Sequence, residues 1–378
     1  GAPGRFRLQW AFAGAALLSC LRLAAADGAT CGSKSGNDAI RKVRASLTEA
    51  LASKPPPRMV TAKHLVVIVP ADGTASSIGG GVAAHAYASM PLEGKKGELP
   101  HTTFTKFVVV SHSHVKGPPG ISIGDDVCGG GGFADKESVR FLRTEMKHRL
   151  KEFAPDVLSC SLVGFCPELL SKGLDAQLPF LRAMRSEDAD GTPLRGDLLP
   201  VMMQSQDVEL SVKVGAALSL LVQPGGVWEG ERVLFVFTGD MSSGLPEDEA
   251  LHCDDMSTQV LTRQGVAQAA EYFHTLLSGG AANGCVGPRA APVGYGPMLA
   301  AARVAGDLRM MDRRVSLAHE PMKGALKGYA SVLFWDDSHS IMEQHAIASA
   351  GGVLLEDGEK PARKRGVLRA LIRRRRTA

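Results

Sequence analysis

The chain has 378 residues, of which 44% are hydrophobic, 5% aromatic and 22% charged, and its formal net charge is +4. This composition is typical of a globular protein with a large buried core, and it excludes a disordered or fibrous chain. The seven cysteines form no CxxC pair, which argues against a disulfide framework and against a structural zinc site. We therefore expect reduced thiols.

In chain order, apolar runs alternate with helical patterns between the two ends of the chain. The pattern predicts strands at 65–69, 107–110, 157–163, 198–203, 233–238 and 329–335, and helices at 38–52, 81–90, 138–152, 208–221, 258–278 and 296–304. Elements that alternate in this way build a sheet with helices on both faces. The expected fold class is α/β, a three-layer α/β/α sandwich with a mostly parallel or mixed central sheet.

Both ends of the chain differ from its middle. Residues 1–27 join two arginines to an apolar run and then to small residues, the layout of a signal or transit peptide, but the run is too short to span a bilayer. The segment 360–378 carries nine Lys and Arg side chains, which predicts contact with a polyanion. We expect three parts: an N-terminal leader or extension (1–27), one α/β domain (28–337) and a C-terminal extension with the basic tail (338–378). No transmembrane segment is expected.

Polar residues follow the predicted strands at points where α/β sheets hold their ligands. His112 and His114 follow the strand at 107–110, Asp240 follows the strand at 233–238, and Cys285 lies in a tight loop before a helix. Imidazole, carboxylate and thiolate groups bind transition metals or act as nucleophile and base. The sequence thus offers a candidate site, although each of these residues alone is more often structural.

Phosphate chemistry and serine hydrolysis are weaker interpretations of the chain. Glycines at 79–81 and 129–132 suggest phosphate loops, but neither stretch has a Lys-Ser/Thr ending or the GxGxxG spacing. Ser242 and Ser243 lie in GDMSSG, which does not match the GxSxG turn of serine hydrolases. A phosphate enzyme and a serine hydrolase are both disfavoured.

Seven short motifs, taken in order, resemble those of one family. They are PADGT with AAHAY (70–74, 83–87), SHSH (111–114), GD with ADKE (124–125, 134–137), SKGLDAQLPFL (171–181), FVFTGDMSSG (235–244), CVG with PV (285–287, 292–293) and GYASV (328–332). The family they resemble is the Memo family, which is related to LigB-type class III extradiol dioxygenases. The resemblance implies a LigB/Memo-like sandwich and cytoplasmic localisation, whereas organellar or secretory targeting would follow if 1–27 is a leader.

The resemblance also implies which residues line the family's cleft. His114, Asp240 and Cys285 stand at matched positions, with His114 and Asp240 in catalytic roles. Three imidazoles of the family pattern are absent, at the positions of Ala71, Lys172 and Ser243. Asp72, next to the first of these positions, is the expected substitute ligand, ahead of His112 and of His85, which we expect to be a packed residue.

Two functions follow from the matches and the departures. Loss of three imidazoles favours a degenerate Memo-like protein, a binding or signalling module with a peptide or protein partner in the cleft. The alternative is a metal-dependent redox or dioxygenase-like enzyme, in which His114, Cys285 and a carboxylate from Asp72 or Asp240 hold a single iron, copper or zinc ion. An extradiol iron site of the usual kind requires two histidines and a carboxylate, which the matched positions alone do not supply.

Overall fold

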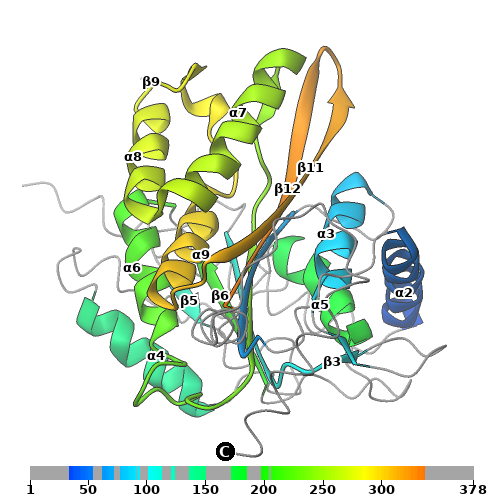
Figure 1. The fold of residues 1–378 in the computed structure, drawn as a ribbon, viewed down its shortest axis with the longest axis vertical. Helices are drawn as coiled ribbons and strands as arrows, with labels where there is room; N and C mark the ends of the chain where they lie inside the picture. Colours follow the sequence, from blue (N-terminus) through cyan, green and yellow to red (C-terminus); the bar gives the residue numbers. More distant parts are fainter. Residues whose placement is uncertain are drawn as a thin grey trace, which may run out of the picture. The chain divides into compact units, whose positions relative to one another are not determined.

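A mixed β-sheet lies at the centre of the computed structural model of the chain (Figure 1). The chain divides into two units, Gly1–Asp336 and Asp337–Ala378. The structure describes parts of the first unit: residues 34–53, 62–71, 77–90, 92–93, 101–112, 121–123, 136–149, 172–184, 197–203 and 206–336. The predicted strand at 157–163 lies outside these residues, as do 1–27 and the basic tail.

The sheet has the order β11-β12-β1-β7-β4-β6-β5, and β8 pairs with β12 beside this path. Its strands are β1 (His64–Val69), β4 (Lys106–His112), β5 (Ile121–Ile123), β6 (Leu198–Met203), β7 (Val233–Thr238), β8 (Ser243–Leu245), β11 (Asp312–Met322) and β12 (Ala325–Trp335). The four central strands β1, β7, β4 and β6 are parallel, and β12, β11 and β5 each run antiparallel to a neighbour. Every residue of β6 and β7 is buried, as expected for apolar runs covered on both faces.

Helices cover both faces of the sheet, and they lie on opposite sides of it in Figure 1. One layer consists of α2 (Lys34–Ser53), α3 (Ile78–Ala88) and α5 (Lys172–Met184); the other consists of α4 (Lys136–Arg149), α6 (Val208–Ser219), α7 (Glu247–Gln259), α8 (Val266–Leu277) and α9 (Tyr295–Asp307). Alternate residues of β1 belong to different cores: Leu65 and Val67 pack in the α2/α3/α5 core, and Val66 packs in the other. The expected three-layer α/β/α sandwich is confirmed.

Short elements complete the described part of the chain. They are the pairs β2 (Leu92–Glu93) with β3 (His101–Thr102) and β9 (Ala281–Ala282) with β10 (Cys285–Val286), the π-helical turn η2 (Val260–Gln264) and the 3₁₀ turn η3 (Pro288–Ala290). The single helix predicted at 258–278 is wrong, because Gly265 has a φ of 84° and separates η2 from α8. Left-handed backbone of this kind ends a helix, and glycine adopts it without steric cost. No helix within the described ranges has the length and apolar character needed to cross a membrane.

Candidate functional site

Asp240 and Ala71 meet where the parallel strands β1 and β7 end. The stretches Val69–Ala71 and Thr238–Asp240, named here the carboxyl edge, run side by side because Val69 pairs with Thr238. The Asp240 Oδ1 atom accepts a hydrogen bond of 3.0 Å from the backbone N–H of Ala71, and both residues are buried. Two of the positions matched by the family resemblance therefore lie in contact.

A second loop holds the Asp240 backbone from the other side. Gly294 donates its N–H to the carbonyl of Asp240 at 3.3 Å, and Val293 donates to the carbonyl of Met241 at 3.2 Å. Gly239 and Gly294 approach so closely that a Cβ atom on Gly294 would overlap the Cα atom of Gly239. Glycine is required at this crossing because any side chain would push the two loops apart.

Lys327 supplies the positive charge next to Asp240. Its Nζ atom lies 3.2 Å from Asp240 Oδ2 and 5.0 Å from the centre of the Tyr329 ring. Tyr329 donates a hydrogen bond of 2.6 Å to Glu320 Oε2, and burial together with that hydrogen bond raises the pKa of the Tyr329 hydroxyl to about 12. Tyr329 is therefore protonated at neutral pH, and the network joins β7, β12 and β11.

The motifs AAHAY and QLPFL fasten two helices to the end of β1. Tyr87 donates to Gln177 Oε1 at 2.8 Å, and Gln177 Nε2 donates to the carbonyl of Pro70 at 3.0 Å. The Tyr87 and Phe180 rings stack with their centres 5.0 Å apart. These motif residues have a structural role, since all four are buried.

A second buried carboxylate lies between α7 and the β11–β12 hairpin. Asp254 Oδ1 accepts from the backbone N–H of Ser242, and Asp254 Oδ2 contacts His319 Nε2; both distances are 2.9 Å. Burial raises the pKa of the Asp254 carboxyl, and this effect outweighs the opposing contacts from Ser242 and His319. A Cβ atom on Gly328 would overlap Asp254 Oδ2, so β12 passes the carboxylate at close range.

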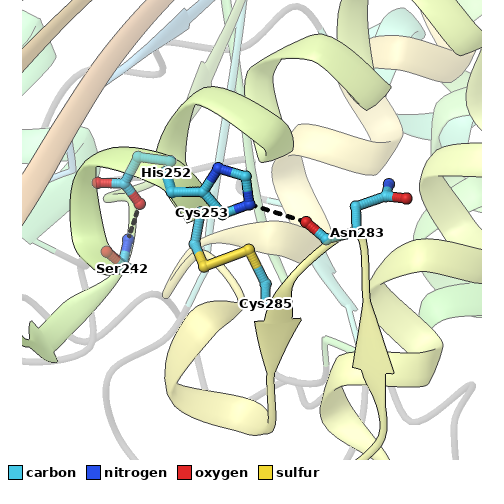
Figure 2. The surroundings of a disulfide bond; sticks show 6 residues. Ser242, His252, Cys253, Asn283 and Cys285 are labelled. Carbon is cyan, nitrogen blue, oxygen red and sulfur yellow. Dashed lines mark hydrogen bonds between the residues drawn. A yellow bond between two sulfur atoms is a disulfide. The ribbon is translucent and has the colours of Figure 1, made fainter. Parts of the chain in front are cut away.

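The expectation of reduced thiols is wrong for Cys253 and Cys285, which form a disulfide (Figure 2). The two residues are 32 positions apart in the sequence, but α7 and β10 bring their Cα atoms to 5.6 Å, within the usual range for a disulfide. Beside it, His252 Nε2 lies 2.8 Å from the carbonyl oxygen of Asn283. While this bond is intact, Cys285 has no thiolate to offer a metal ion.

The structure describes only some of the remaining predicted ligands. His114 and Asp72 lie outside the described residues, and so do the glycines at 129–132. His112 is buried at the end of β4, whereas His85 is exposed on α3, against the expectation that it is packed. Across the described ranges, no group of three or more His, Cys, Asp or Glu side chains could hold a metal ion.

The glycines at 79–81 and the serine pair after β7 both have structural explanations. The glycines lie in the first turn of α3, where the Ser77 hydroxyl accepts a hydrogen bond of 3.0 Å from the Gly80 N–H and caps the helix. Ser242 is fully buried and donates its backbone N–H to Asp254, and the half-buried Ser243 begins β8 and pairs with Lys327 of β12. Neither arrangement shows a phosphate loop or an exposed nucleophile.

Sequence reasoning missed Lys327, Asp254 and His319. Lys327 stands two residues before the predicted strand at 329–335, whereas the strand in the structure begins at Ala325 and includes it. An isolated charge next to an apolar strand is the signal that could have identified it.

No family model matches the chain, and no curated protein matches it significantly. The function is therefore inferred from the contacts described above.

Proposed function

We propose that the chain is a divergent Memo-like binding module that holds a peptide or protein partner at the carboxyl edge. The observation that carries this proposal is the pair formed by Lys327 and Asp240, at 3.2 Å. The Lys327 ammonium group balances the charge of the Asp240 carboxylate, and the backbone N–H of Ala71 donates a hydrogen bond to the other carboxylate oxygen, Oδ1. A carboxylate engaged in this way is a poor ligand for a further cation.

The disulfide supports the same choice. The metal-dependent alternative uses Cys285 as a thiolate, and the bond to Cys253 removes that ligand. Of the donors that this alternative names, Cys285 and Asp240 lie within the described residues. Cys285 does not fit a metal site in the disulfide form, and Asp240 is already engaged by Lys327 and Ala71. The described residues therefore favour the binding module over metal-dependent redox chemistry.

Two exposed apolar side chains, on segments that follow β1 in sequence or contact the loop after β7, suit a partner. Ile78 opens α3, the helix that follows β1, and Val293 contacts the Met241 backbone just after β7. Both side chains are exposed. Large apolar side chains on a surface are favourable contact points for another protein.

The metal content of the purified protein tests the first half of the proposal. Wild type and Asp240→Asn, purified without chelator and analysed for iron, copper and zinc, are expected to carry no stoichiometric metal. The measurement is repeated after mild reduction, because Cys285 then becomes available. Stoichiometric metal in wild type that is lost in Asp240→Asn would overturn the proposal and support the enzyme.

Site-specific crosslinking tests the second half. A photoreactive residue at Ile78 is expected to capture one discrete partner, and capture is expected to fall in a Val293→Asp background. The matched control places the same residue at Lys63, exposed at the opposite end of β1. Equal capture at both positions, or capture unaffected by Val293→Asp, would show that the carboxyl edge is not the binding surface.

A further inference from the structure

β11 forms one edge of the sheet and offers a long pairing surface. Its eleven residues, Asp312–Met322, pair along their whole length with β12, and no other described strand pairs with β11. An edge strand presents unpaired backbone N–H and C=O groups on its outer side, and these groups can join another strand. The two strands form the long orange hairpin in Figure 1.

Exposed apolar side chains gather at this edge. Of the seven exposed large hydrophobic residues in the described part of the chain, three lie on β11 or just before it: Met311 (72% exposed), Val315 (38%) and Met322 (50%). β11 also carries charged side chains, which on an edge strand oppose indiscriminate pairing and favour a partner of complementary charge. The edge is therefore suited to contact with another polypeptide.

The charges of β11 are arranged symmetrically about its middle. Arg314 and Glu320 each lie three residues from Leu317, and residues of the same parity share one face of a strand. Arg314 Nη1 contacts the Ser89 hydroxyl and Glu320 accepts from Tyr329, so both side chains are held in place. In an antiparallel pair of two identical strands centred on Leu317, each Arg314 faces the Glu320 of the other copy.

We propose that β11 pairs antiparallel with β11 of a second copy of this chain, with the twofold axis at Leu317. The pairing joins the two sheets into one and forms two Arg314–Glu320 pairs between the copies. Pro321 has no N–H to donate, so the new ladder spans Arg314 to Glu320 of each copy. A second copy is favoured over an unrelated peptide because this strand carries both complementary charges at equal distance from its apolar centre.

Charge reversal tests whether the β11 strands of two copies pair symmetrically. Sedimentation velocity is expected to show a dimer for wild type and self-association weakened by about tenfold or more in Arg314→Glu and in Glu320→Arg, since each change creates two repulsive pairs. An equimolar mixture of the two variants is expected to form a heterodimer, because both of its cross-strand pairs are again opposite in charge. The double variant is expected to form homodimers for the same reason.

The same set of proteins distinguishes a loss of self-association from misfolding and from binding to a different partner. Heterodimer formation from the mixture shows that both variants are folded, and Lys213→Glu on α6 serves as the matched surface control. A monomeric wild type, or a dimer that neither variant weakens, would overturn the proposal. So would a monomer whose photoreactive residue at Val315 captures a different polypeptide.

Discussion

Asp254 on α7 and His319 on β11 are joined by a contact of 2.9 Å between Oδ2 and Nε2, although they are 65 residues apart in the sequence. The carboxylate is fully buried, and its other oxygen is held by the Ser242 backbone. This contact fastens the hairpin of β11 and β12 to the helix that also carries Cys253.

The buried Asp254 carboxyl gives the fold a specific pH dependence. Because burial raises its pKa above the ordinary 3.8, the unfolded chain loses this proton at a lower pH than the folded chain. The contribution of Asp254 to the free energy of unfolding therefore falls as pH rises from below 3.8 through the raised pKa. Urea unfolding of wild type and Asp254→Asn across this range is expected to show wild type losing stability relative to the variant. A constant difference between the two would contradict the assignment.

Removal of the Lys327 ammonium is expected to destabilise the carboxyl edge. Lys327→Met removes the ammonium group next to the buried Asp240 carboxylate, and we expect the free energy of unfolding to fall by about 2 kcal/mol. This is less than for a fully buried pair, because the lysine side chain is 18% exposed. The double variant Lys327→Met with Asp240→Asn is expected to be more stable than Lys327→Met alone. Lys213→Met, which breaks an ion pair with Glu209, is the control; because the Glu209 carboxylate is 69% exposed, the change should alter stability by less than about 0.5 kcal/mol. A similar loss in both single variants would show that the buried pair is unimportant.

Loss of the disulfide is expected to lower stability through the unfolded state. For a separation of 32 residues, removing the bond in a Cys253→Ala, Cys285→Ala variant should cost about 3–4 kcal/mol in the free energy of unfolding. Guanidinium unfolding with and without a reductant measures it. The reductant should destabilise wild type by a similar amount and leave the double variant unchanged. An unchanged midpoint for wild type would mean that the thiols are already reduced.

The close passage of β12 past Asp254 makes a pair of glycine substitutions informative. Gly328→Ala places a Cβ atom against Asp254 Oδ2 and within 2.9 Å of Met241 Cβ, so we expect a loss of about 3 kcal/mol. Gly306→Ala on α9 meets no atom within 4 Å and should be neutral or stabilising by up to about 1 kcal/mol. Thermal unfolding of both variants measures the difference. Comparable melting temperatures would show that the strand and the carboxylate do not pack so closely.

Strands that are buried on both faces can be predicted from the sequence alone. The apolar runs at 198–203 and 233–238 predict β6 and β7 with their observed bounds, because a continuous apolar run needs no partner to be recognised. β11 could not be predicted in this way. Its sequence, DRRVSLAHEPM, mixes charged and apolar residues, and its strand conformation depends on pairing with β12.

In the candidate site, too, contacts that follow from the apolar strands could be predicted, whereas contacts made by the β11–β12 hairpin could not. The position of Asp240 follows from the end of an apolar strand, and its contact with Ala71 follows from the parallel pairing of β1 and β7. The partners Lys327 and His319 come from the hairpin, which lies far away in sequence and carries no motif for these contacts. The disulfide was missed for the same reason, since only the packing of α7 against β10 brings its cysteines together. The roles of His114 and Asp72 stay predictions.

The place of β1 in the sheet has a consequence for synthesis on the ribosome. β1 is made early, yet it is flanked by β7 and β12, and Leu65 pairs with Trp335. Until Trp335 has left the exit tunnel, a nascent chain that has already placed β1 against β7 exposes an apolar strand with an open edge. Such edges attract chaperones and promote aggregation, so the interval before β12 arrives is the vulnerable period in the biosynthesis of this fold.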